Sequence, residues 1–186
     1  MTNLSRRAFG TLAVCTLVAA GASSAFSQDL ENTLYLDLSY GRVVIQLRPD
    51  VAPQTVARIK ELARQGFYDG TPFHRVIPNF MAQGGDPTGT GTGGSGKRLE
   101  AEFSAVKHGR GTVSMARSSD VNSADSQFFI CFAPAPHLDG QYTAFGQVVE
   151  GMEFVDRIKK GDPGDNGLVS APQDRIVKMQ VAADAQ

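Results

Sequence analysis

The chain has no tryptophan, only two cysteines and almost no net charge. Cys15 lies in an N-terminal segment described below, so Cys131 would remain alone after its removal and could form no internal disulfide. A formal net charge of −1 gives no electrostatic reason to bind nucleic acid or anionic lipid. The histidines, His74, His108 and His137, are scattered without metal-ligand spacing, which predicts no metal and no cofactor.

Long hydrophobic runs are also missing. No stretch of 18 or more apolar residues occurs in the body of the chain, so no membrane-spanning helix is expected after the N-terminal segment. There is no internal repeat and no long linker. With 186 residues and 41% hydrophobic composition, the chain can bury one core. We therefore expect a single domain over residues 28–186, acting as a monomer.

The first 27 residues are predicted to be an export signal rather than part of the fold. Arg6 and Arg7 give a positive start, residues 12–22 are a short apolar stretch, and small residues allow cleavage after Ala25 or Ser27. The arginine pair favours the twin-arginine route, with an ordinary secretory signal as the alternative. Either route predicts a periplasmic or secreted protein. Cleavage would leave 16 basic and 19 acidic residues, a net charge of −3.

The body alternates apolar and polar residues in short segments, which is typical of β-strands. Leu34, Leu36 and Leu38 share one face of the first such segment, and a hairpin is expected across Tyr40 and Gly41. The eight expected strands cover residues 33–39, 43–47, 73–77, 80–83, 112–116, 127–132, 144–149 and 175–181.

Two amphipathic helices are expected among these strands. Pro53 suits a first helical position, and the apolar face that follows it ends at Gly66. A second apolar face, on Met152, Val155 and Ile158, ends at Gly161. The fold is therefore predicted to be mainly β, a closed eight-stranded antiparallel β-barrel capped by two α-helices.

Residues 73–86 suggest a site. Arg75 stands among Phe73, Phe80 and Met81, and a guanidinium that cannot lose its proton is costly among apolar groups unless polar groups hold it. Residues 126–132 and 138–140 repeat the mixture of aromatic and amide side chains. Together they describe an apolar pocket with a fixed positive donor but no activated nucleophile. Such a pocket suits a reaction that makes or breaks no bond to a heavy atom.

Residues 73–86, 111–116 and 126–140 closely resemble, in order and separation, motifs of the cyclophilin family of peptidyl-prolyl cis-trans isomerases. The resemblance covers the chain from about residue 33 to about residue 181. It implies the cyclophilin fold, with a substrate groove on the outer face of the barrel, and rotation of Xaa-Pro bonds as the activity. It also implies that the partners are proline-containing, unfolded or partly folded polypeptides.

The resemblance assigns roles to individual residues. Arg75 is expected to be the catalytic residue, whereas its neighbours alone would equally allow a structural arginine anchored by a core amide. His74 is expected to be a hydrogen-bonded structural histidine, because the reaction moves no proton. The expected substrate-binding residues are Phe80, Met81, Phe129 and Leu138 in a proline pocket, Gln83 and Gln127 as substrate-facing amides, Ala116 and Arg117 in a segment whose backbone pairs with the peptide, and His137 and Tyr142 at the groove.

Three of these positions depart from the pattern of many family members. His137 stands where many carry the tryptophan that contributes to binding cyclosporin, so weak inhibition is expected. Arg117 stands where eukaryotic members often have asparagine, and Tyr142 where they often have histidine.

Other functions are less well supported by the residues. A catalytically silent proline-peptide-binding module or a periplasmic holdase remains the rival, and retention of Arg75 with its apolar neighbours argues against it. A hydrolase lacks support, since Ser114 and Ser126 show no nucleophile-elbow pattern and no paired base. Residues 91–97 fit the first seven positions of a phosphate-binding P-loop, but Arg98 replaces the required Ser or Thr. We expect a flexible loop there, beside the groove.

Overall fold

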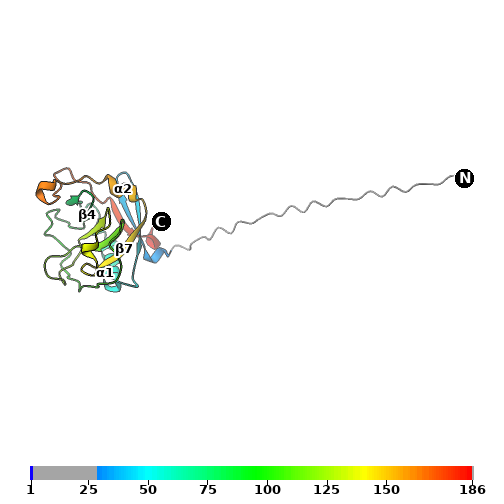
Figure 1. Ribbon diagram of the computed structural model, residues 1–186, viewed down its shortest axis with the longest axis horizontal. Helices are drawn as coiled ribbons and strands as arrows, with labels where there is room; N and C mark the ends of the chain where they lie inside the picture. The colour runs from blue at the N-terminus through cyan, green and yellow to red at the C-terminus, as the bar shows by residue number, and fades with distance from the viewer. Residues whose placement is uncertain (2–28, 186) are drawn as a thin grey trace.

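All eight expected strands form, and they make one antiparallel sheet in the computed structural model of the protein (Figure 1). The structure describes Met1 and residues 29–185, so the rest of the predicted export signal lies outside the described residues. The strands are β1 (Thr33–Leu38), β2 (Gly41–Leu47), β3 (Arg75–Ile77), β4 (Met81–Gly84), β5 (Thr112–Met115), β6 (Phe128–Cys131), β7 (Ala144–Glu150) and β8 (Lys178–Val181). Their order in the sheet is β3-β4-β6-β5-β7-β2-β1-β8.

The sheet is an open half-barrel, so the expectation of a closed barrel was wrong. β3 and β8 are its edges, and in the described part of the chain no ladder joins them. The segments before them meet at an isolated bridge between Pro72 and Arg175, beside which Ile176 N donates to the Thr71 carbonyl oxygen and Phe73 N donates to the Asp174 carbonyl oxygen, both at 2.9 Å. β3 begins two residues later than expected and β8 three residues later.

The β1–β2 hairpin forms as predicted. Leu34, Leu36 and Leu38 are buried on one face of β1, and Leu38 pairs with Gly41 across the turn. A Cβ atom at Gly41 would run into the ring of Phe154. Glycine therefore allows the helix that carries Phe154 to pack directly on the hairpin.

The first helix, α1 (Pro53–Arg64), begins at the predicted proline and buries its predicted apolar face. Its first N–H groups are satisfied from a distant loop: the Glu102 carboxylate accepts from Gln54 N at 2.9 Å and from Thr55 N at 2.8 Å. A carboxylate at a helix N-terminus also interacts favourably with the helix dipole. This contact attaches the long loop before β5 to α1.

The second helix, α2 (Met152–Arg157), is shorter than predicted. It ends four residues before Gly161 because Ile158 leaves the helical conformation, with a ψ of 130°. α1 and α2 lie at opposite ends of the sheet in Figure 1. Within the described residues, no helix has the length and apolar composition needed to cross a membrane.

Apolar side chains pack on both faces of the sheet, as β6 shows. Phe128 and Ile130 join the main core, whereas Phe129 and Cys131 join a second, smaller cluster. Successive side chains of a strand point to opposite faces, so this second cluster lies on the outer face of the half-barrel. We name it the outer cluster; its buried members are Met81, Phe129, Cys131, Ala135 and Leu138, with Ile77, Phe80, Ala116 and Tyr142 packed against them.

Candidate active site

A cleft of about 620 Å³ lies over the outer cluster. Ten of the eleven residues predicted from the sequence line it, and Gln127 lines an adjoining hollow instead. The lining residues are His74, Arg75, Phe80, Met81, Gln83, Thr90, Gly91, Ala116, Arg117, Phe129, His137, Leu138, Tyr142, Asp165, Asn166 and Leu168. Segments far apart in the sequence thus meet at one site.

The floor of the cleft is apolar. Met81, Phe129 and Leu138 are almost fully buried beneath it. The Phe80 ring packs against His137 with centroids 5.3 Å apart, and the ring of Tyr142 meets Phe129 edge-on at 5.9 Å. These side chains form a shallow apolar seat that a small hydrophobic ring could occupy.

Arg75 lies at the edge of this seat, and its guanidinium is held on two sides. Nη1 donates to Gln83 Oε1 at 3.1 Å, Nε donates to the Asn166 carbonyl oxygen at 3.0 Å, and Nη2 donates to Asn166 Oδ1 at 2.9 Å. Burial lowers the pKa of Arg75, yet the group stays charged at any physiological pH. With the described residues Arg75 makes no salt bridge. Three of its five N–H groups are used, which leaves two for a ligand.

Gln83 faces Arg75 because the two residues are direct partners in the β3–β4 ladder. Gln83 Nε2 donates to Gln127 Oε1 at 2.9 Å, and Gln127 Nε2 donates to the carbonyl oxygens of Gly91 and Gly93 at 3.0 and 2.9 Å. We name this chain of side chains, from Gln127 through Gln83 to Arg75, the amide relay. Gln127 thus lies behind Gln83 and not in the main cleft, where we expected a substrate-facing amide.

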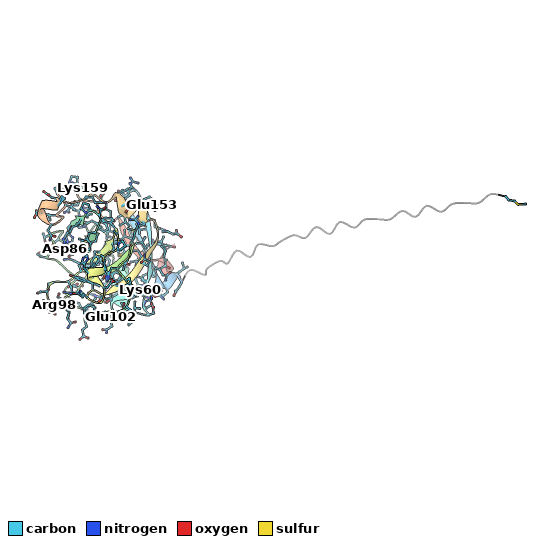
Figure 2. All side chains as sticks on the ribbon, in the orientation of Figure 1. Lys60, Asp86, Arg98, Glu102, Glu153 and Lys159 are labelled. Carbon is cyan, nitrogen blue, oxygen red and sulfur yellow. The ribbon has the colours of Figure 1, made fainter. Side chains whose placement is uncertain are left out.

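The amide relay ends on residues 84–96, the glycine-rich loop. The buried Asp86 carboxylate holds this loop: Oδ1 accepts from Thr88 N and Oγ1 at 2.7 and 2.8 Å, and Oδ2 accepts from the backbone N–H groups of Thr90, Gly91 and Gly93 at 3.1, 2.6 and 3.1 Å. Burial opposes ionisation, but these hydrogen bonds outweigh it and lower the pKa of Asp86 to about 2. Figure 2 shows Asp86 within the outline of the domain.

The far end of the glycine-rich loop is held in the same way by Asp125. Its carboxylate accepts from Ser95 N at 2.7 Å, from Gly96 N at 2.9 Å and from the Ser95 hydroxyl. Backbone N–H groups that a P-loop would offer to phosphate are therefore already occupied by two carboxylates. The loop lies beside the cleft, as predicted, but it is anchored by these bonds.

Arg117 and Tyr142 form one wall of the cleft. The Arg117 guanidinium lies 4.5 Å from the Tyr142 ring centroid and donates to the carbonyl oxygens of Gln141 at 3.0 Å and Ser118 at 2.9 Å. The Ala116 N–H donates to the Gln127 carbonyl oxygen at 2.9 Å, so this one backbone group is not free to pair with a peptide.

His74 is buried, but it is not the hydrogen-bonded histidine that we predicted. Neither ring nitrogen has a hydrogen-bond partner among the described residues. Burial lowers the pKa of His74, so its ring is neutral at neutral pH.

His108 lies beneath the cleft in an arrangement that superficially resembles a hydrolase triad. Its Nδ1 is 3.1 Å from Asp139 Oδ1 and its Nε2 is 3.1 Å from Ser114 Oγ. Ser114, however, is completely buried, and its hydroxyl donates to the Thr143 carbonyl oxygen at 2.8 Å. The ring instead stacks under Phe129, with centroids 6.3 Å apart. The group supports the floor of the cleft and gives no access to a nucleophile.

The described residues contain no group of three or more His, Cys, Asp or Glu side chains placed to hold a metal ion. The lining of the cleft combines an apolar seat with the Gln83 amide and two arginines, Arg75 and Arg117.

An eight-stranded half-barrel with an arginine beside an apolar cleft on its outer face defines a cyclophilin-like protein. The family model for cyclophilin type peptidyl-prolyl cis-trans isomerase/CLD matches residues 33–181. The chain belongs to this family and is a peptidyl-prolyl cis-trans isomerase.

Relatives and solved structures agree with this assignment. A probable peptidyl-prolyl cis-trans isomerase of Brucella suis is 48% identical over 193 residues, which covers 97% of this chain and 98% of that protein. The crystal structure of cyclophilin AquaCyp293 from Hirschia baltica matches with a TM-score of 0.74 at 27% identity, covering 85% of this chain and 76% of that one. A third match is a Cryptosporidium parvum cyclophilin type peptidyl-prolyl cis-trans isomerase, crystallised in the presence of the dipeptide Ala-Pro. It has a TM-score of 0.72 at 30% identity, and the match covers 80% of this chain and 98% of that one.

Sequence reasoning missed Asn166, which makes two of the three hydrogen bonds to Arg75. It stands in the segment Gly164-Asp165-Asn166-Gly167, whose composition signals a turn. That signal could have located the turn, but nothing in it indicates that the turn would meet a residue 91 positions earlier. The missed residue belongs to a long-range contact.

Proposed function

We propose that this isomerase accelerates rotation about Xaa-Pro bonds in exported proteins as they fold, and that Arg75 is its catalytic residue. The observation that carries the proposal is the Arg75 guanidinium, held at the edge of an apolar cleft with two N–H groups to spare. Its ligands are proline-containing, unfolded or partly folded polypeptides, and it acts as a monomer without a metal or cofactor.

The chemistry follows from the electronic structure of the amide. Rotation has a barrier of ~18–20 kcal/mol because nitrogen shares its lone pair with the carbonyl group. When the bond twists, the sharing is lost and the proline nitrogen becomes a hydrogen-bond acceptor. A donor placed at that nitrogen stabilises the transition state and not the ground state. Arg75 has the free N–H groups to be this donor.

Arg75 cannot supply the whole acceleration. One charged hydrogen bond is worth ~1.5–3 kcal/mol net, which corresponds to about 10- to 150-fold in rate. Removing a positioned donor typically costs more, ~10²–10³ in rate, because its partner is then left unsatisfied. We assign the remainder to the apolar seat of Phe80, Met81, Phe129 and Leu138, which would hold the proline ring while the bond turns. The Ala-Pro dipeptide named with the Cryptosporidium parvum structure supports a proline-containing ligand.

The cellular role rests on the predicted export signal. Uncatalysed isomerisation takes ~10–100 s, long enough to limit folding of a newly exported protein. Replacing Arg6 and Arg7 by lysine should block delivery to the periplasm if the twin-arginine route is used, as measured by cell fractionation. Continued export of this variant would favour the secretory alternative. A protein retained in the cytoplasm even with the native signal would contradict the proposed location.

The catalytic assignment is tested by isomerisation of a short Xaa-Pro peptide in a coupled assay. Arg75→Ala should lower kcat/KM by ~10²–10³. The matched control is Arg48→Ala, which removes another partly exposed arginine whose carboxylate partner is Asp50, and it should leave the rate unchanged. Equal rates for the native protein and Arg75→Ala would contradict the mechanism. Peptide binding without turnover by the native protein would favour the silent module or holdase.

A further inference from the structure

The segment that carries Asn166 lies along the outer edge of β3. We name residues 161–169 the rim loop. Gly161 N donates to the Val76 carbonyl oxygen at 2.9 Å, and Val76 N donates to the Gly167 carbonyl oxygen at 2.7 Å. Two residues after Gly167, Val169 N donates to the His74 carbonyl oxygen at 2.9 Å. The rim loop thus borders the same strand that carries Arg75, on the side away from β4.

The conformation of the rim loop is set by its own hydrogen bonds and by lack of space. Asp162 Oδ1 accepts from Gly164 N at 2.7 Å, and the Asp162 carbonyl oxygen accepts from Gly167 N at 2.8 Å. Gly167 has a φ of +79°, and a Cβ atom there would lie 2.5 Å from Ile77 Cγ1. Asn166 itself adopts the left-handed conformation, with a φ of 49°, which asparagine tolerates better than most residues. The turn that carries Asn166 is therefore held by these hydrogen bonds and by the close packing of Gly167.

Asn166 accepts two hydrogen bonds along one edge of the Arg75 guanidinium. Its carbonyl oxygen takes the Nε–H and its Oδ1 takes one N–H of Nη2, while Gln83 takes one N–H of Nη1. One N–H remains on each terminal nitrogen. Gln83 alone would leave the guanidinium free to swing about a single contact, whereas a two-point contact on Asn166 defines its plane.

We propose that Asn166 is a positioning residue for the reaction: the rim loop orients the Arg75 guanidinium so that its two free N–H groups are directed into the cleft before substrate arrives. The inference rests on the proposed role of Arg75 as the donor. An arginine side chain has several rotatable bonds, and a donor that is already oriented loses little freedom when the amide twists. Asn166 therefore acts on the rate of rotation and only weakly on peptide affinity.

The test replaces Asn166 by glycine. Glycine keeps the left-handed backbone and the carbonyl oxygen that accepts from Arg75 Nε, and it removes only the Oδ1 acceptor. The matched control is Asn79→Gly, because Asn79 is exposed and also adopts the left-handed conformation, with a φ of 60°. We expect Asn166→Gly to lower kcat about tenfold with KM within about twofold, as loss of one orienting hydrogen bond implies. Asn79→Gly should match the native enzyme.

A double-mutant cycle separates positioning from a general effect on the fold. If Asn166 acts through Arg75, Asn166→Gly should have no further effect on kcat in an Arg75→Ala background, measured by exchange NMR. A tenfold fall that persists without Arg75, or native kcat in Asn166→Gly, would overturn the proposal. The proposed function fails separately, because that failure would appear as unchanged activity in Arg75→Ala alone.

Discussion

Two glycine-containing loops support the same guanidinium from opposite sides, and they do so by different means. The glycine-rich loop reaches Arg75 indirectly, through the amide relay of Gln127 and Gln83. The rim loop touches Arg75 directly through Asn166. The first loop is held by two carboxylates, those of Asp86 and Asp125, and the second by backbone pairing with β3. The comparison shows that the guanidinium is contacted from segments on both sides of its strand.

Among variants of the residues that support Arg75, the largest effect should come from removing both supports together. Gln83→Ala and Asn166→Gly should each lower kcat about tenfold, and the double variant about 100-fold, because each removes a separate contact from the guanidinium. The measurement is kcat for an Xaa-Pro peptide at saturating concentration. If the double variant were no slower than the slower single variant, the two loops would not be independent supports.

Loosening only the glycine-rich loop should lower the rate less, but it should clearly lower the free energy of unfolding. In Asp86→Asn the amide N–H₂ would have to face backbone donors on one side or the other of the carboxylate site. The free energy of unfolding should fall by about 2–3 kcal/mol, measured by urea denaturation. Asp50→Asn is the control, because its ion pair with Arg48 is exposed and should contribute almost nothing. Native stability in Asp86→Asn would show that the carboxylate does not hold the loop.

The free energy of unfolding should fall in two steps as the pH is lowered. Burial lowers the pKa of both His74 and His108, so the unfolded chain binds protons first and stability falls as the pH drops through about 6.5. Asp86 has a pKa of about 2, below its ordinary value of 3.8, so its contribution is present above about pH 4 and is lost as the pH falls through 2. Urea denaturation between about pH 7 and pH 2 measures both steps. The lower step should be absent in Asp86→Asn, and its persistence there would assign it to another carboxyl group.

The difference between the two loops also shows what the sequence could predict. Alternating leucines located β1, and the motif around Arg75 located the relay residue Gln83, because both signals are local. The open edge between β3 and β8 was not predictable, since it depends on how far irregular chain extends before each strand. Asn166 was missed for a similar reason: it contacts Arg75 only because the rim loop, which is far from β3 in the sequence, pairs with that strand.

The positions of Ala116 and Gln127 show a related limit. Resemblance to a family indicated correctly that both residues belong near the groove, but not which of their polar groups remain free. The Ala116 N–H and both ends of the Gln127 amide are used inside the protein. Which polar groups remain free depends on the three-dimensional arrangement of several strands and loops, and a sequence motif does not contain that information.

The central claim is that Arg75 acts on the twisted bond and not on peptide binding. Its most direct test is exchange NMR over a titration of Xaa-Pro peptide up to saturation, which reports the rate of rotation on the enzyme and the dissociation constant together. We predict that Arg75→Ala lowers the on-enzyme rate by ~10²–10³ and leaves the dissociation constant within about threefold. An unchanged on-enzyme rate, or a loss of activity explained wholly by weaker binding, would contradict the account.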